Sequence, residues 1–368
     1  MRPACAGLWT SLALPVLKKT PKTSTVLIRS ASEFAHYVGL SRSAVSRVLN
    51  QQPGLRPDTI ARVRKAIEET GFTPNAHARH LRGKRTAMIG VCMENFLTPP
   101  SVEKLSVIDG LLRSRGYTTL IEVFNPGAGR KLVQHFLGLR VDGIIFIGNF
   151  APDELGQRIT ELKRHATPHL VIDHLGIKHA NSVSVDRAEA MRQVTNHLLD
   201  LGHRRFGLLG ISGPYQTVTD RLYGIHGALA ARGLDIASCT RSLDYLHTRT
   251  EHFNYGAVLA QAFARLPDRP TAYLAVNDET AIGALLEFQA QGLRVPEDFS
   301  IVGFNNQTIC LVTKPNLSSV DHQIAKSMEV AVTTILGQIG RPISDEITAQ
   351  LIAPKFIVRG STGPAPRT

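Results

Sequence analysis

Basic and hydroxyl side chains recur at helical spacing within residues 41–50, which read SRSAVSRVLN. Val45 and Val48 fall on one side of such a helix, whereas Arg42 and Arg47 fall on the other. An arginine can donate two hydrogen bonds to O6 and N7 of a guanine, which discriminates against other bases by about 1–3 kcal/mol. The stretch therefore predicts a helix whose polar face has the chemistry to contact base edges in a DNA major groove.

A second short helix is predicted immediately before this stretch, over residues 30–38. Its apolar face consists of Ala31, Phe34, Ala35 and Val38. Ser30 followed by Glu33 fits a capping box, and Gly39 can take the left-handed conformation that ends a helix. Together the two segments predict a helix-turn-helix, which places its second helix in the major groove. Any small helical hairpin would show the same pattern, so the pattern alone leaves both interpretations open.

The charge distribution favours the DNA-binding interpretation. Residues 1–85 contain 15 Lys and Arg against 4 Asp and Glu, a net of +11, whereas residues 86–368 contain 27 against 26. Nearly all of the net charge of +12 therefore lies in the first quarter of the chain. A uniformly basic enzyme would not be partitioned in this way, but a duplex-binding module joined to a neutral body would be.

Length and composition predict a folded protein of two or three domains, with 368 residues of which 43% are hydrophobic and 20% charged. No run of eighteen apolar residues occurs, so we expect no membrane span. The four cysteines have neither zinc-ligand nor disulfide spacing, which fits a reducing cytoplasm; they are Cys5, Cys92, Cys239 and Cys310. Residues 1–25 loosely imitate a signal peptide, but Pro15 breaks the short apolar part, and we favour a disordered extension.

A third helix is predicted from Pro57 to the neighbourhood of Gly71, with Ile60, Val63 and Ile67 as its apolar stripe. The three helices would form a compact head. The basic residues 76–85 that follow contain one large apolar side chain and are too short for a stable isolated helix. They indicate a linker that folds only against a partner.

The remainder of the chain alternates buried strands with helices. The predicted strands are 87–91, 118–123, 143–147, 169–172, 206–209, 272–276 and 300–304. Continuous apolar strands separated by helices indicate parallel sheets covered on both faces, and about 280 residues of this pattern suit two lobes. The fold class is therefore α/β, with a helical head and a core of two parallel-sheet lobes. Ligands of such folds bind at the carboxyl ends of the strands.

A series of short motifs resembles the LacI/GalR family of bacterial transcription repressors over residues 30–362. The quoted matches, in order, are GLS followed by VSRVLN within 39–50, GFTPN at 71–75, ARHL at 78–81, IGV at 89–91, VDGII at 141–145, LGHRR at 201–205, RLYG at 221–224, ND at 277–278, RVPED at 294–298, VGF at 302–304 and VRGST at 358–362. The resemblance implies a helix-turn-helix head that binds an inverted-repeat operator as a homodimer. A hinge would join it to a periplasmic-binding-protein-like core that senses a small molecule.

The resemblance also implies the domain boundaries. They are 1–25 for the extension, 26–74 for the DNA-binding domain, 75–86 for the hinge helix or linker, 87–185 with 321–350 for the first lobe, 186–320 with 351–362 for the second lobe, and 363–368 for the tail. The tail has no leucine heptads, so a dimer is expected in preference to a coiled-coil tetramer.

By position, Arg42 and Ser43 would open the recognition helix, with Arg47 one turn further along. The alternative for both arginines is phosphate contact without sequence information. Leu81 stands where the family places a hinge leucine that wedges into the minor groove and kinks the duplex, although it could instead pack on the core. The candidate DNA-binding residues are Ser30, Ser41, Arg42, Ser43, Ala44, Ser46, Arg47, Asn50, Asn75, Arg79 and Leu81.

Carried over in the same way, a set of polar residues would line the ligand cleft. These candidates are Glu94, Ser101, Asp173, Thr217, Arg221, Asn277, Asn305 and His322. Carboxylates, amides and guanidinium groups suit a sugar or sugar derivative, because each hydroxyl needs a donor and an acceptor. Arg221 could otherwise be a surface charge at a helix start, and His322 could be a surface histidine.

Two departures from the family pattern bear on the ligand. Asn305-Asn306 stands where many members carry an Asp pair, which removes a negative charge. Residues 98–101 read TPPS where many members have an Asn-Pro-Phe-Phe run, so the stacking aromatics are absent and a flat purine is disfavoured.

We expect no enzymatic activity, cofactor or metal, because the chain has no Gly-rich phosphate loop, GxSxG elbow or HExxH motif. The expected partners are double-stranded operator DNA, a sugar-like effector and a second copy of the chain, in the cytoplasm. Two alternatives remain: a sugar receptor with a degenerate head, and a small-molecule enzyme on an α/β core.

Overall fold

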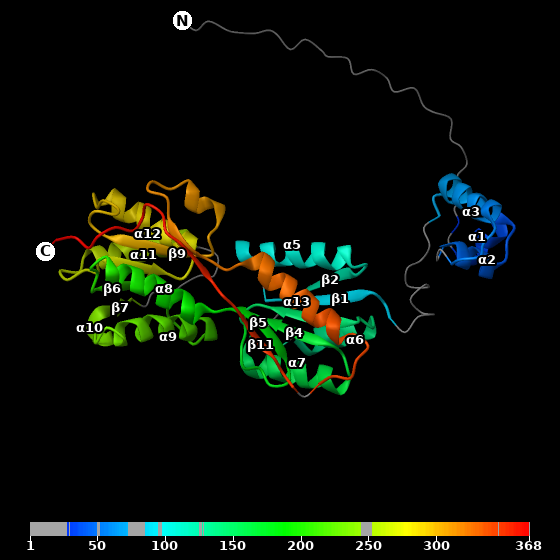
Figure 1. Ribbon diagram of the computed structural model, residues 1–368, viewed down its shortest axis with the longest axis horizontal. Coiled ribbons are helices and arrows are strands. Elements are labelled where there is room, and N and C mark those ends of the chain that lie inside the picture. Colours follow the sequence, from blue (N-terminus) through cyan, green and yellow to red (C-terminus); the bar gives the residue numbers. More distant parts are fainter. Residues whose placement is uncertain are drawn as a thin grey trace, which may run out of the picture. The chain divides into compact units, whose positions relative to one another are not determined.

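The computed structural model describes residues 28, 30–49, 52–72, 85–94, 98–124, 127, 129–243, 252–344 and 346–367 (Figure 1). The chain divides into two compact units, residues 1–84 and residues 85–368. The first contains the predicted head and the second contains both predicted lobes.

Three helices form the head, and their bounds agree with the prediction. They are α1 (Ala31–Val38), α2 (Arg42–Leu49) and α3 (Pro57–Thr70). Ser30 caps α1, since its Oγ accepts a hydrogen bond from the Glu33 amide at 3.1 Å. Gly39 ends α1 with φ of 64°, a left-handed conformation that favours glycine.

Apolar side chains from all three helices meet in one small core. Phe34 and Phe72 stack with their ring centroids 4.2 Å apart, and Val45 and Val63 are fully buried beside them. Ala31 was predicted on this apolar face but is exposed, because it occupies the first position of α1, outside the helix contacts.

The first lobe is a six-stranded sheet with strand order β11-β5-β4-β3-β1-β2, in which every pairing is parallel. Its strands are β1 (Met88–Met93), β2 (Thr118–Val123), β3 (Gly143–Ile147), β4 (His169–Ile172), β5 (Asn181–Val185) and β11 (Ala349–Ile352). Its helices are α5 (Pro99–Ser114), α6 (Gly129–Gly138), α7 (Pro152–Arg164) and α13 (Ile324–Gln338). Helices α5 and α13 contribute to the core on one face of the sheet, whereas α6 and α7 contribute to the core on the other.

The second lobe repeats this architecture with strand order β12-β10-β9-β8-β6-β7, and only β12 runs antiparallel to its neighbour. Its strands are β6 (Phe206–Leu209), β7 (Thr240–Ser242), β8 (Ala272–Ala275), β9 (Ser300–Phe304), β10 (Ser318–Asp321) and β12 (Lys355–Ile357). Its helices are α8 (Arg187–Asp200), α9 (Gln216–Ala230), α10 (Ile236–Cys239), α11 (His252–Ala264), α12 (Asp278–Ala290) and the 3-10 helix η1 (Thr308–Leu311). Helices α8 and α9 pack on one face of the sheet and α11 and α12 on the other (Figure 1).

The chain passes between the lobes three times. The crossings follow β5, β10 and β11, at Asp186, at residues 322–323 and at residues 353–354. The predicted boundaries are displaced by one or two residues here. Asp321 still pairs with Lys355 in the second sheet, and residues 351–352 belong to β11 in the first sheet, because strand pairing continues to the end of each strand.

Candidate nucleic-acid interface and ligand cavity

Helix α2 presents a polar face to solvent. Arg42, Ser43 and Arg47 are exposed, whereas Ala44 and Ser46 are half-buried at the edges of that face. The opposite side packs inward, in agreement with the predicted helix faces. The exposed side chains are therefore carried on a helix whose orientation the head's core fixes.

Two polar contacts fix the start of α2. Ser41 caps the helix, since its Oγ accepts a hydrogen bond from the Ala44 amide at 3.1 Å. Arg62 of α3 donates from Nε to the carbonyl oxygen of Val38 at 2.9 Å and from Nη2 to that of Gly39 at 3.2 Å. Arg62 was not among the predicted residues, because nothing in its spacing shows that its side chain reaches back to the turn between α1 and α2.

The remaining head candidates divide into two groups. Ser30 caps α1, as described above, and Arg47 Nη2 lies 3.4 Å from the carbonyl oxygen of Pro53 in the loop after α2. Four candidates lie outside the described residues: Asn50, Asn75, Arg79 and Leu81. Of the predicted hinge or linker at 75–86, only residues 85 and 86 belong to the described part of the chain.

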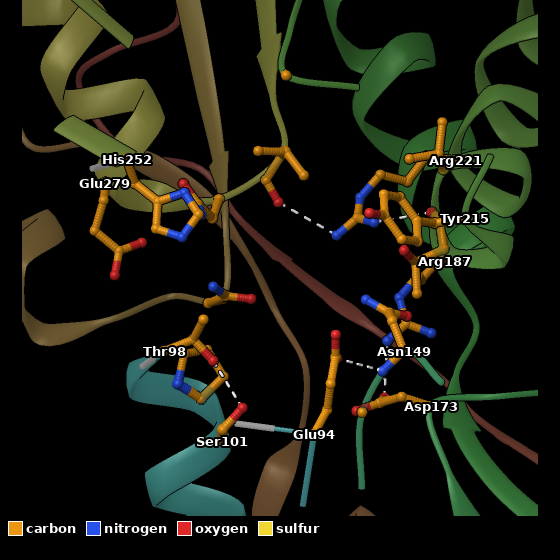
Figure 2. A pocket seen from close by; sticks show the side chains of 18 of the residues that line it. Glu94, Thr98, Ser101, Asn149, Asp173, Arg187, Tyr215, Arg221, His252 and Glu279 are labelled. Carbon is orange, nitrogen blue, oxygen red and sulfur yellow. Dashed lines mark hydrogen bonds and ion pairs between the residues drawn. The ribbon is translucent and has the colours of Figure 1, made fainter. Parts of the chain in front are cut away.

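A cavity of about 400 Å³ lies between the two lobes (Figure 2). Seven of the eight predicted cleft residues line it: Glu94, Ser101, Asp173, Thr217, Arg221, Asn277 and Asn305. The eighth, His322, does not line it and is not on the surface either. It is buried against the Phe304 ring, with the ring centroids 4.9 Å apart, and lines a second, much smaller cavity beside Asp173. The tight crossing after β10 turns its side chain inward.

Asp173 is the centre of a buried ionic cluster. Its carboxylate pairs with the ammonium of Lys104 on α5 and accepts a hydrogen bond from Arg187 Nη2 at 2.7 Å (Figure 2). Burial alone would raise the pKa of Asp173, but the two cations hold it far below its ordinary value. Burial and the same cations lower the pKa of His322 well below its ordinary value, so this imidazole is neutral at pH 7. Asp173 is therefore an ionised and already paired carboxylate.

Arg221 lies on α9 with its guanidinium buried. Nη1 donates to the carbonyl oxygen of Thr217 at 2.8 Å and Nη2 to that of Val276 at 3.2 Å, and Cζ lies 4.3 Å from the centroid of the Phe304 ring. Burial and the nearby charge of Arg187 lower the pKa of Arg221 to about 9, so the group is still protonated at neutral pH. The surface-charge alternative for Arg221 is wrong, since the residue is only 6% exposed.

Carboxylate and hydroxyl groups stand elsewhere in the cavity. Glu94 Oε2 accepts the amide of Asn149 at 2.7 Å, and the hydroxyls of Thr98 and Ser101 lie 2.7 Å apart (Figure 2). Glu279 enters from α12. The cavity therefore offers cationic, anionic and neutral polar groups at different positions.

The start of α12 positions the two cleft asparagines. Asn277 caps the helix, with its Oδ1 accepting the amide of Thr280 at 2.8 Å. The neighbouring Asp278 is buried, and its carboxylate accepts the Gln307 amide at 2.8 Å, which ties the turn containing Asn305 to the helix start. Asn305 itself has φ of 117°, a conformation that few side chains tolerate.

Further residues that were not predicted also line the cavity. Asn149 follows β3 and Ser212 lies just beyond β6, so the rule that ligands bind at strand ends could have found both. Tyr215 and Tyr255 also line the cavity. Aromatic rings thus reach the cavity from the second lobe instead of from residues 98–101. The absence of aromatic residues at 98–101 therefore no longer disfavours a flat ligand.

Two properties of the described ranges bear on the expected chemistry. Within them, no group of three or more His, Cys, Asp and Glu side chains is arranged to hold a metal ion. No described helix is both long and apolar enough to cross a bilayer.

Comparison with known proteins identifies the family. Residues 32–75 match the family "Bacterial regulatory proteins, lacI family", and residues 195–362 match "Periplasmic binding protein-like domain". Catabolite control protein A of Staphylococcus epidermidis is 30% identical over 293 residues, which cover 78% of this chain and 85% of that protein. An uncharacterised helix-turn-helix regulator of Streptomyces limosus is 28% identical over 347 residues, with 93% and 97% covered. The chain thus belongs to the LacI family of DNA-binding transcriptional regulators, and its core is the family's periplasmic-binding-protein-like effector domain.

Solved structures show the same fold. The lac repressor dimer bound to operator and the anti-inducer ONPF has a TM-score of 0.78 at 23% identity, with 91% of this chain and 99% of that chain covered. The complex of the transcriptional regulator CelR with cellobiose has a TM-score of 0.62 at 24% identity, with 91% and 100% covered. These likenesses confirm the predicted fold class of a helix-turn-helix head with a two-lobed α/β core.

Proposed function

We propose that this regulator is a repressor that binds an inverted-repeat operator as a homodimer and responds to a sugar-like small molecule. The observation that carries the proposal is the exposed polar face of α2, held in place by a dedicated core and two polar anchors. One similar structure contains a repressor dimer on its operator and another contains cellobiose, which supports this assignment of partners.

Arg42, Ser43 and Arg47 are assigned to base contact, because they are the exposed polar side chains at the start and middle of α2. Ser41 and Ser30 each cap the start of a helix. The free backbone amides at these two helix N-termini would contact phosphates, because helix N-termini bind anions favourably. Ala44 and Ser46 would contribute close packing at the groove. The proposed roles of Asn50, Asn75 and Arg79 are phosphate contact, and that of Leu81 is insertion into the minor groove.

The effector signal would pass through the point where the chain enters the first lobe. The Asp142 carboxylate accepts the amides of Thr86 and Ala87 at 3.0 and 2.8 Å, so this entry point is fixed to the lobe. A movement of the lobe on ligand binding would therefore displace the attached linker. In a dimer, separation of the two linkers would release the operator.

The cavity supports a polyhydroxylated effector, since amide, hydroxyl, carboxylate and guanidinium groups line it together. Its volume lies near the lower end of the range of about 300–1,000 Å³ found for small-molecule sites. We place the protein in the cytoplasm with its DNA and assign it no enzymatic activity.

The test is selection of DNA sites by the purified full-length chain, followed by anisotropy titrations at several salt concentrations. Wild type should select an inverted repeat, with affinity falling steeply as salt rises. A sugar receptor with a degenerate head would form no sequence-selective complex, and that result would overturn the proposal. Size-exclusion chromatography with light scattering tests the dimer.

Two variants at one position separate base contact from phosphate contact. Arg47→Lys keeps the charge but loses the bidentate geometry, whereas Arg47→Ala loses both. If Arg47 contacts a base, both variants should lose operator affinity, and Arg47→Lys should keep wild-type affinity for non-specific DNA. If Arg47→Lys binds the operator as wild type does, Arg47 contacts only phosphate.

A further inference from the structure

We infer that the effector carries a carboxylate, so that it is a sugar acid in which one end of a polyhydroxylated molecule binds at Arg221. This inference rests on the proposed function, because it specifies the ligand of the same cavity. It depends on how the charges lining the cavity are distributed and on which hydrogen-bonding groups are already used.

Arg221 is a buried cation without an ion-pair partner among the described residues. Its hydrogen bonds go to two backbone carbonyls, it lies over an aromatic ring, and its Nε is buried with no acceptor. Asp173 and, more weakly, Asp220 act on its charge, but Asp173 is already paired with two other cations, and the Asp220 carboxylate accepts a hydrogen bond from Gln216 and does not line the cavity. A buried charge without a counterion is unfavourable, so a ligand anion would be strongly favoured there.

The neighbouring charges do not neutralise Arg221. Lys104 and Arg187 are both paired with the one carboxylate of Asp173, so this cluster retains a positive charge of its own. The charge of Arg187 also lowers the pKa of Arg221, which places the two cations near each other. The wall of the cavity formed by α5, α8 and α9 therefore has more positive than negative charge.

The residue after Phe304 does not offset this imbalance. Asn305 directly follows Phe304, whose ring lies under the Arg221 guanidinium, and it lines the same cavity with a neutral amide. A carboxylate at 305 would add a negative charge to the cavity that contains Arg221. With an amide there, the ligand has to supply the anion.

Three acceptors around Arg221 are already used in hydrogen bonds. The carbonyls of Thr217 and Val276 are already used by Arg221, and the Oδ1 of Asn277 is used by the amide of Thr280. This leaves the Asn277 amino group and the remaining guanidinium N–H groups. A carboxylate, which only accepts hydrogen bonds when ionised, matches this arrangement better than a hydroxyl does.

Acceptors stand away from Arg221. The Glu94 and Glu279 carboxylates line other parts of the cavity, and Figure 2 shows Glu279 on the side opposite Arg221. Ligand hydroxyl groups can donate to these carboxylates. The arrangement thus fits one anionic end and several hydroxyls in a single small molecule.

The experiment is isothermal titration of the full-length protein with stereochemically matched neutral and acidic sugars. The pairs are glucose with glucuronate and gluconate, galactose with galacturonate and galactonate, and mannose with mannonate, at constant ionic strength. Glucose 6-phosphate tests a phosphate in place of the carboxylate. We expect at least one acid to bind at least about tenfold more tightly than its neutral partner.

Asn305→Asp is the decisive variant, because it changes few atoms and adds a carboxylate to the lining of the cavity that contains Arg221. It should weaken binding of the acid by about tenfold or more while leaving its neutral partner nearly unchanged. Arg221→Met should abolish the preference for the acid. Arg232→Met is the charge-matched control, since Arg232 pairs with Asp200 on the surface of the same lobe, and it should bind as wild type does.

Three results would overturn the inference. They are a neutral sugar that binds at least as tightly as its acid, binding of glucose 6-phosphate but of no carboxylate, and no binding of any acid at millimolar concentration. None of these results affects operator binding, which is measured separately on DNA. A failure of the ligand assignment is therefore distinguishable from a failure of the proposed regulator.

Discussion

Helices α8 and α9 approach each other closely at Gly224. A Cβ atom built on Gly224 would lie 2.0 Å from the carbonyl oxygen of Ala188, where real Cβ atoms essentially never come within 3.0 Å. The opposing atom belongs to a helix backbone, so it cannot move aside as a flexible side chain would. Gly224→Ala should therefore push α9 away from α8, and with it the two cavity cations that these helices carry, Arg187 and Arg221.

The magnitude follows from the size of the overlap. Overpacking of a filled interior destabilises by about 1–3 kcal/mol, and the gain from replacing a helical glycine offsets about 0.5–1 kcal/mol of this. A net loss of about 1–2 kcal/mol corresponds to a fall in melting temperature of roughly 2–8 °C for a unit of this size. Ligand affinity should fall as well, because the distance between the two cations changes.

Gly227 on the same helix provides the matched control. A Cβ there would meet nothing within 4 Å. Gly227→Ala should therefore stabilise the protein by up to about 1 kcal/mol through helix propensity alone, and the melting temperature should rise. Differential scanning calorimetry of the full chain measures both variants, and titration with a bound ligand measures the effect on the cavity. If Gly224→Ala melted at or above wild type, the close approach of the two helices would not be limiting and the reasoning would be refuted.

Three further predictions concern single charged groups. Arg47→Ala should weaken operator binding by about 1–3 kcal/mol in anisotropy titrations, and site selection by the variant should show a relaxed preference at the base pair that Arg47 contacts. Asp173→Asn should leave Lys104 and Arg187 as buried cations without an ion-pair partner, which should destabilise the core by about 3–5 kcal/mol. Chemical denaturation measures this loss, and an unchanged midpoint would mean that the cluster is not coupled to folding. Burial lowers the pKa of His203 below its ordinary value, so the folded state favours the neutral imidazole. The stability that this contributes is complete above about pH 6.5 and is lost as the pH falls from there through the folded-state pKa. Melting curves between pH 7.5 and 5 should show this loss in wild type, and a His203→Gln variant should show a weaker dependence on pH.

The parts of the fold with strong periodicity could be predicted from the sequence. The bounds of β2, β3, β4, β6 and β9 agree with the predicted strands, because each is a run of apolar or β-branched residues between turn signals. Two buried strands were missed, β5 and β10, since serines interrupt them. Those serines are satisfied by tertiary contacts: Ser184 accepts from Arg187 Nη1 at 2.7 Å, and Ser318 accepts the amide of Arg359 at 2.8 Å.

The strand-end rule accounts for part of the predicted cavity lining, whereas Ser101, Thr217 and Arg221 lie on helices and were predicted from the resemblance alone. Asp173 and Asn305 each follow a strand directly and Asn277 lies one residue beyond the end of β8, so the strand-end rule places all three. Lys104 and Arg187 could not be found in this way. Lys104 comes from within α5 and Arg187 from the first crossing between lobes, and only the packing of both against Asp173 brings them to the cavity.

That ionic cluster also determines how a ligand could act on the core. The Asp173–Arg187 ion pair joins the first lobe to the start of α8 in the second, so it links the two lobes beside the cavity. A ligand can shift an equilibrium between lobe arrangements only through contacts that differ between them. Groups such as Arg221 on the second lobe and Glu94 on the first satisfy this condition, because a molecule that contacts both favours the arrangement in which they are closest. A ligand that bound the second lobe alone would leave the anchored linker at Thr86 where it was, and would not regulate.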